Sequence, residues 1–207
     1  MLQNKNVIIG YSGHAYVVAE SYLSKGNSLE YYTNLIKVDN NPFNLGYLGC
    51  ETDSNFKGWN MKLVYILGIG DNNLRYKIAQ LLLSKSKIIE SVIDANAIIS
   101  KRASCGVGVF ASKGVIVNAF SIIRDFVILN TGCIIEHECE IGAAAHIAPG
   151  AVLAGNVKIG ERSFIGANSV IKQGVEIGDD VIIGAGSVII NNVSSNTKIV
   201  GNPGRII

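Results

Sequence analysis

The 207-residue sequence is poor in proline, tryptophan and charge, with three prolines, one tryptophan and 16% charged residues. Hydrophobic residues make up 48% of it, a balance that excludes an intrinsically disordered chain. The formal net charge is only +2 and the basic residues are scattered, so no nucleic acid is expected as a partner. The longest uncharged apolar stretch, 141–157, contains His146, Pro149 and Asn156, which argues against a transmembrane helix.

Cysteine and histidine are also sparse. The four cysteines form no CxxC pair, and the three histidines lack metal-ligand spacing, so no metal is expected. The first ten residues run straight into a strand-like segment without a signal peptide, which predicts a cytoplasmic protein with no membrane insertion.

A six-residue repeat fills the second half of the sequence. Sixteen positions in steps of six from Ile99 to Ile189 are all apolar, whereas chance at 48% hydrophobic content gives roughly 10⁻⁵. The position four residues after each of these anchors is always Ala, Val, Ser or Cys. This period fits neither a helix nor a simple strand, and it predicts a parallel β-helix of triangular, three-hexad coils. Residues 18 apart should then stack about 4.8 Å apart.

Smaller features of the repeat carry further expectations. Glycine follows the anchor at 106, 142, 160, 166, 178 and 184, where we expect turn geometry that a β-carbon would oppose. Cys105, Cys133 and Cys139 occupy anchor or corner positions and are expected to be small buried side chains. The N-terminal domain can cover one open end of the coil, and the segment 191–207, which breaks the repeat, is expected to cap the other.

The first ninety-odd residues alternate strand and helix, which predicts an α/β domain with a Rossmann-like parallel sheet. The expected strands are 7–10, 35–40, 63–67 and 87–93, with helices after Gly13 and over 74–83. Since ligands of such sheets bind at the carboxyl ends of the strands, Gly10, Asp39 and Gly70 should share one rim. The spacing Gly10-x-x-Gly13 is not a dinucleotide fingerprint. We therefore expect two domains, 1–94 and 95–207.

His137 is the best candidate for chemistry. It stands between Glu136 and Glu138 and off the anchor register, so the core does not need it. A neighbouring carboxylate orients an imidazole as a general base, and the spacing leaves open which glutamate does so. Gly155 follows 18 residues later and should offer a backbone N–H beside His137 as an oxyanion donor. His146 lies half a coil away, so the two histidines should diverge within one chain, whereas a subunit interface could bring them together.

At this point the sequence resembles a known family. The uninterrupted hexapeptide repeat resembles the left-handed β-helix acyltransferases. Three motifs narrow the resemblance to the bacterial sugar acyltransferases of the PglD and NeuD types, namely Gly10-Tyr-Ser-Gly13-His14, Ile69-Gly70-Asp71-Asn72-x-x-Arg75 and Ile128-Leu-Asn130-Thr-Gly-x-x-x-Glu136-His137-Glu138.

The resemblance implies homotrimers that use acetyl-CoA, with active sites between neighbouring β-helices. It implies His137 as base, Glu138 as its partner and Gly155 as the amide at the thioester carbonyl. Cofactor contacts are implied for His146, Gly155 and Arg205. The nucleotide sugar is implied to contact Ser12, Gly13, His14, Asp39, Gly70, Asp71, Arg75 and Asn130. The Asp39-Asn40 pair, where some amino-sugar enzymes carry two acids, and Gly204, where the family ending has Ala, depart from the family pattern.

The function expected is acetyl transfer from acetyl-CoA to the amine of a nucleotide-linked 4-amino-deoxysugar, by direct attack with a histidine base. A sugar O-acetyltransferase of the sialic acid type is the alternative, because an amine and a hydroxyl need much the same machinery. A non-catalytic scaffold that binds sugar nucleotides is the alternative from another class. The stacked His137 and Gly155 argue against the scaffold.

Overall fold

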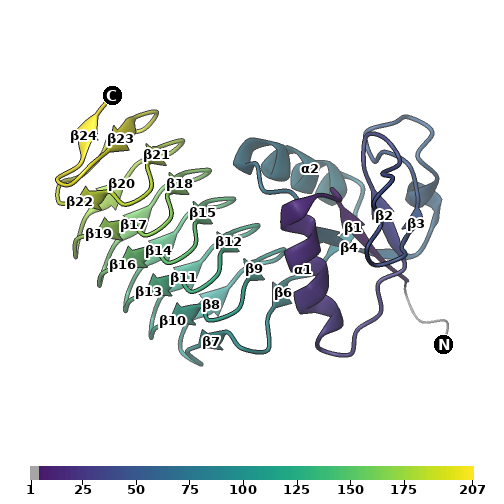
Figure 1. The fold of residues 1–207 in the computed structure, drawn as a ribbon, viewed down its shortest axis with the longest axis horizontal. Helices are drawn as coiled ribbons and strands as arrows, with labels where there is room; N and C mark the ends of the chain where they lie inside the picture. Colours follow the sequence, from purple (N-terminus) through teal and green to yellow (C-terminus); the bar gives the residue numbers. More distant parts are fainter. Residues whose placement is uncertain (1–4) are drawn as a thin grey trace.

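The computed structural model describes residues 5–207, which form an α/β domain followed by a left-handed parallel β-helix (Figure 1). The α/β domain lies beside the first coils, and the C-terminus lies at the opposite end of the β-helix. No helix within the described residues is long and apolar enough to cross a membrane.

The N-terminal sheet is parallel, with strand order β3-β2-β1-β4-β5. Its strands are β1 (Lys5–Ile9), β2 (Tyr31–Thr33), β3 (Gly46–Tyr47), β4 (Leu63–Leu67) and β5 (Ile88–Ile89). Helices α1 (Gly13–Leu23) and α2 (Asn72–Ser84) cover opposite faces, and a short 3₁₀ helix, η1, spans Lys57–Asn60. The order turns back between β1 and β4, the place where such sheets bind ligands.

The second predicted strand is wrong in position. The strand is Tyr31–Thr33, and residues 35–40 form an exposed loop after it. Leu35 and Ile36 are 81% and 73% exposed, so their apolar character does not reflect burial in the sheet. The segment 87–93 also divides, because β5 belongs to the sheet and β6 (Val92–Ile93) opens the β-helix. The fold therefore changes between Ile89 and Val92.

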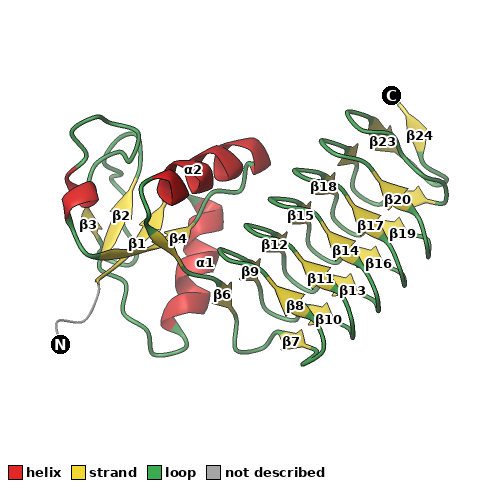
Figure 2. Ribbon diagram, turned by 180° about the vertical axis from the view of Figure 1, so that it is seen from behind, coloured by secondary structure: helices red, strands yellow, loops and turns green. Residues whose placement is uncertain are grey.

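Three sheets make the three faces of the β-helix prism (Figure 2). The first face contains β6, β9 (Phe110–Ala111), β12 (Ile128–Leu129), β15 (His146–Ile147), β18 (Phe164–Ile165) and β21 (Ile182–Ile183). The second contains β7 (Ile98–Ile99), β10 (Ile116–Val117), β13 (Ile134–Ile135), β16 (Val152–Leu153), β19 (Val170–Ile171) and β22 (Val188–Ile189). The third contains β8 (Ser104–Cys105), β11 (Ile122–Ile123), β14 (Glu140–Ile141), β17 (Lys158–Ile159) and β20 (Glu176–Ile177).

The predicted 18-residue register is confirmed. Val117 pairs with Ile135, Ile135 with Leu153 and Leu153 with Ile171. The anchors and the small corner residues fill one apolar core that runs along the prism. Large aliphatic side chains point inward at each strand while the small residues fit under the corners, so the six-residue period sets the diameter of the coil.

The glycine after the anchor has a different reason from the one expected. At Gly142 a β-carbon would lie 2.6 Å from Glu161 N and 2.7 Å from Gly160 C, because the next coil passes close by. Left-handed φ values occur two residues further on, at glycines such as Gly132 and Gly150 and also at non-glycine residues such as Glu138 and Asn156. Close approach between coils, not turn geometry, therefore requires the glycine.

The two ends of the β-helix differ. At the C-terminal end β23 (Lys198–Val200) continues the first face, and β24 (Arg205–Ile206) folds back antiparallel to it, so the expected cap is present. At the other end β7 and β8 are edge strands. The expectation that Cys105 is buried is wrong, because β8 has no strand of its sheet beneath it and Cys105 is exposed. Cys133 and Cys139 are buried as expected.

Candidate active site

His137 projects from the edge between the second and third faces, in the turn from β13 to β14; we call the turns along this edge the His137 edge. Its side chain is 52% exposed, and its Nδ1 lies 3.0 Å from Glu138 Oε2. Glu136 is engaged elsewhere, because its Oε2 accepts a hydrogen bond from Asn118 Nδ2 at 3.0 Å. Of the two candidate carboxylates, Glu138 is thus the one that contacts the imidazole.

Gly155 lies directly against the His137 ring. A β-carbon at Gly155 would be 2.5 Å from both Cε1 and Nε2 of His137, so any larger residue would push the ring away. The two turns are held in register by a hydrogen bond from Asn156 N to His137 O at 2.8 Å. Gly155 is buried, and its N–H has no acceptor within residues 5–207. The structure therefore places a free backbone donor beside an exposed imidazole.

His146 lies on a different face of the prism. It belongs to β15 on the first face, is 8% exposed, and its ring centroid is 6.2 Å from that of His14 in α1. Burial is the main cause that lowers the pKa of His146 to about 3 and that of His14 to about 4, with Arg75 adding to both shifts. Both imidazoles are therefore neutral at neutral pH. Asn130 Nδ2 lies 3.1 Å from His146 Nε2.

The predicted rim residues gather at the carboxyl ends of β1 and β4. Ser12 and Gly13 begin α1, and both are exposed. Asp71 caps α2, because its side chain accepts a hydrogen bond from Leu74 N at 2.8 Å. Gly70 and Asp71 line a cavity of about 310 Å³ that opens between α2 and the first face of the β-helix. The rim therefore faces the β-helix and not only bulk solvent.

Arg75 is buried at the boundary between the α/β domain and the β-helix. It is 1% exposed, and its guanidinium donates to Asn72 Oδ1 and to the backbone oxygens of Ile69, Gly70, Phe126, Ala144 and Ala145. Three of these six bonds, to Phe126, Ala144 and Ala145, join the α/β domain to the β-helix, and the other three hold the guanidinium within the α/β domain. Asn72, to which the sequence motif assigned no role, completes this junction by donating to Arg162 O and Ser163 O at 2.8 and 3.2 Å.

Two further predicted residues are exposed and stand apart. Asp39 lies on the loop after β2, which reaches the rim because Tyr16 Oη contacts Asn40 O at 3.4 Å. Arg205 lies on β24 at the C-terminal cap. A hollow of about 750 Å³ on the third face has no histidine in its lining.

The predicted site therefore forms two groups. His137, Glu138 and Gly155 lie on the edge between the second and third faces. His14, Asn130 and His146 lie together with Gly70 and Asp71 at the first face, beneath the α/β domain. One face of the prism separates the groups within a single chain.

An α/β domain with a ligand rim, joined to a left-handed β-helix that bears an exposed histidine–carboxylate pair, defines the hexapeptide-repeat acyltransferases. Two family models match the chain: the PglD N-terminal domain over residues 5–82, and the bacterial transferase hexapeptide over residues 138–173 and 156–191. The chain belongs to the PglD-type sugar N-acetyltransferases, enzymes that use acetyl-CoA.

Solved structures agree over almost the full length. PerB from Caulobacter crescentus, solved with CoA and GDP-perosamine, is 32% identical, with 99% of this chain and 97% of that chain covered and a TM-score of 0.91. The acetyltransferase domain of PglB from Neisseria gonorrhoeae, solved with acetyl coenzyme A, is 29% identical, with 99% and 100% covered and a TM-score of 0.91. Two structures of the Caulobacter enzyme carry one histidine replaced by asparagine or alanine. An enzyme is thus favoured over the scaffold alternative.

Proposed function

We propose that this protein transfers the acetyl group of acetyl-CoA to the amine of a nucleotide-linked 4-amino-deoxysugar by direct attack. One observation carries the proposal: the exposed imidazole of His137 is paired with Glu138 and lies beside Gly155, a buried residue whose N–H has no acceptor within residues 5–207. The relatives support an amine as the acceptor, since the Caulobacter enzyme is a perosamine N-acetyltransferase and its structure holds GDP-perosamine.

The chemistry follows from the tautomer that Glu138 selects. A carboxylate at Nδ1 keeps the proton on that nitrogen, so Nε2 is free to accept one, and Nε2 is the nitrogen next to Gly155. The sugar amine attacks the thioester carbonyl and forms the new C–N bond. The carbonyl oxygen takes up negative charge and accepts a hydrogen bond from the Gly155 N–H. His137 accepts the amine proton, and collapse of the intermediate expels CoA thiolate. No acyl-enzyme is needed.

The direct test is a substrate panel. UDP-, dTDP- and GDP-linked 4-amino sugars are offered with acetyl-CoA, alongside free sialic acid, and CoA release is followed with a thiol reagent. We expect acetylation of at least one nucleotide-linked amine. Turnover of sialic acid alone would establish the O-acetyltransferase alternative. His137→Ala should keep the assembly and lose about 10²–10⁴ of kcat, and near wild-type turnover by this variant would remove His137 from its role.

A homotrimer with sites between subunits is part of the proposal, and the second face of the prism supports it. The α/β domain covers the lower coils of the first face, and the third face carries the ion pair Lys158–Glu176 at 2.6 Å. The second face presents a stripe of aliphatic side chains with nothing over it within residues 5–207, namely Ile98, Ile116, Ile134, Val152, Val170 and Val188. Such a stripe is typical of a surface buried between copies.

A threefold axis facing this stripe would also complete the site. It would bring the His137 edge of one copy beside the edge of the next copy that carries Asn130, with His146 next to it. Mixing tests this arrangement. His137→Ala and His146→Ala are each expected to be inactive. After random subunit exchange, each trimer that contains both variants has one intact interface, whereas trimers of a single variant have none. The mixture as a whole should therefore regain about a quarter of wild-type activity. No recovery after confirmed subunit exchange would contradict a shared site.

A further inference from the structure

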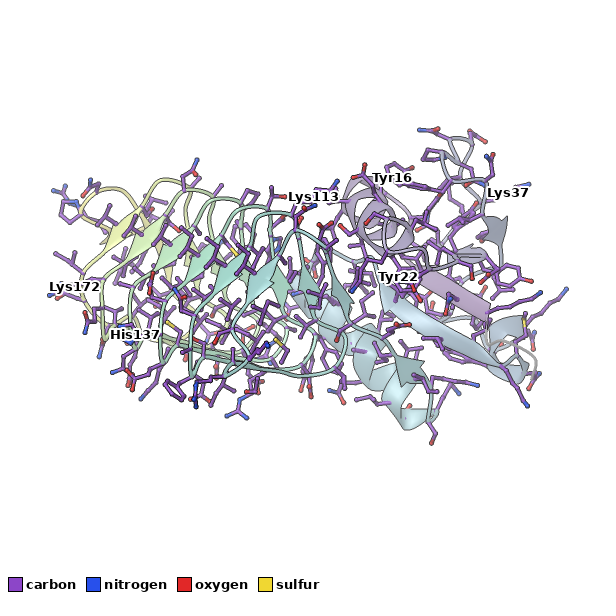
Figure 3. All side chains as sticks on the ribbon, turned by 90° about the horizontal axis from the view of Figure 1, so that it is seen from below. Tyr16, Tyr22, Lys37, Lys113, His137 and Lys172 are labelled. Carbon is purple, nitrogen blue, oxygen red and sulfur yellow. The ribbon has the colours of Figure 1, made fainter. Side chains whose placement is uncertain are left out.

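The His137 edge continues toward the C-terminus as a stack of turns in register. Gly174 N donates to Gly155 O at 3.0 Å, as Asn156 N does to His137 O one coil below. The turns above His137 are residues 154–156, 172–174 and 190–192. Figure 3 shows Lys172 on the same side of the β-helix as His137 and nearer its C-terminal end. Lys172 therefore stands two coils above His137, about 10 Å along the axis.

Lys172 holds a charge that the fold does not use. Its side chain is exposed, and its ammonium group makes no hydrogen bond or ion pair with any residue in 5–207, while its backbone is bonded to Ile189 and Val175. Other cations at this height are paired, since Arg162 contacts Asp180 and Glu161 at 2.7 and 2.9 Å. Among the nine described residues of the three turns above His137, Lys172 is the sole cationic one. Its ammonium group is thus available for an anion.

The fold indicates the direction in which CoA extends from the thioester. The α/β domain covers the first face over the lower coils, where Val92, Phe110 and Ile128 are buried, and because its rim is the proposed acceptor site, we place the acceptor at that end. The top of the His137 edge contains a cavity of about 180 Å³ lined in part by Asn191 and Asn192. The open length of the edge therefore runs from Gly155 toward the C-terminal cap.

We propose that Lys172 binds a phosphate group of CoA, an inference that rests on the proposed roles of His137 and Gly155. The phosphates of CoA lie at the far end of its pantetheine arm from the thioester. The ammonium group of Lys172, on a long flexible side chain two coils above His137, can bind a phosphate at that distance from the thioester. Lys172 is thus a donor-specificity residue, distinct from the groups that touch the acetyl carbon.

The test compares donors that differ in phosphate content: acetyl-CoA, acetyl-3′-dephospho-CoA and acetyl-pantetheine. Lys172→Ala should raise the KM for acetyl-CoA about tenfold with kcat nearly unchanged, and Lys172→Arg should restore it. With acetyl-pantetheine, Lys172→Ala and wild type should agree. If the difference disappears with the dephospho donor, the contact is the 3′-phosphate; if it persists, the contact is the pyrophosphate.

Lys101 provides a matched control. It is exposed on the same edge two coils below His137, whereas Lys172 lies two coils above it. Lys101→Ala should leave the KM for acetyl-CoA unchanged. The proposal would be overturned if the KM rose equally in both variants or did not rise in Lys172→Ala. It would also be overturned if Lys172→Ala raised the KM for acetyl-pantetheine as much as that for acetyl-CoA. Calorimetric binding of CoA without acceptor gives an independent readout. A loss of CoA affinity in Lys172→Ala would support the phosphate contact even if no sugar of the panel were acetylated.

Discussion

Gly155→Ala should separate catalysis from stability, because the atoms nearest to its added side chain belong to the His137 imidazole and not to the backbone. Its added β-carbon would lie 2.5 Å from two atoms of the His137 ring, whereas carbon atoms in contact prefer about 3.5–4.0 Å. The ring must therefore move by about 1 Å or more, a misplacement that typically costs about 10²-fold in rate. Because the ring is half exposed and Gly155 does not have a left-handed φ, the ring can swing outward with little effect on folding.

Gly142→Ala is the matched control. There the β-carbon would meet backbone atoms of the next coil, which cannot swing away, so the free energy of unfolding should fall by about 1–3 kcal/mol, or about 3–10 °C in Tm. We expect Gly155→Ala to lower kcat about 100-fold with a Tm within about 2 °C of wild type.

Steady-state kinetics and thermal unfolding of both variants measure the contrast. A Gly155→Ala enzyme with wild-type kcat would refute the reasoning, as would one that is as unstable as Gly142→Ala. The double variant His137→Ala with Gly155→Ala extends the test. Without the ring there is no clash, so Gly155→Ala should add little to the loss already caused by His137→Ala, and additive losses would show that the two residues act separately.

Three further outcomes are expected. Glu138→Gln should lower kcat by about tenfold or more because the His137 tautomer is no longer fixed, while Glu136→Gln stays within about twofold, as measured by CoA release. Acid should destabilise the fold, because the unfolded chain binds protons at His14 and His146 below pH 6.5, whereas the folded pKa values of about 4 and about 3 keep both imidazoles neutral. The free energy of unfolding, measured with urea, should therefore fall by about 2 kcal/mol per histidine between pH 7 and 5. The fall should be smaller in His146→Gln. Arg75→Ala should cost about 3 kcal/mol or more and release the α/β domain to limited proteolysis, because it removes six buried hydrogen bonds, three of which cross to Phe126, Ala144 and Ala145 of the β-helix.

Repetition made much of the fold predictable. The six-residue period predicts the 18-residue stacking that the pairing of Val117, Ile135 and Leu153 confirms, since a coil that repeats itself has no freedom to change register. The same arithmetic brought His137 next to Gly155. Where the repeat stops, prediction fails: Cys105 is exposed because no strand of its sheet lies below it, and the second strand of the α/β domain is Tyr31–Thr33 and not the exposed apolar segment after it.

The sequence alone thus determined the coil, its register and the histidine that stands off the core, because these depend on periodicity within a few tens of residues. Only the tertiary structure decided which glutamate contacts His137, that Arg75 is consumed by the junction between domains, and that His146 is buried against His14 on another face. The first outcome depends on the hydrogen bond from Asn118 that engages Glu136, and the other two depend on how the α/β domain packs onto the prism. Such packing brings together residues that are far apart in sequence and share no period, so no local pattern encodes it.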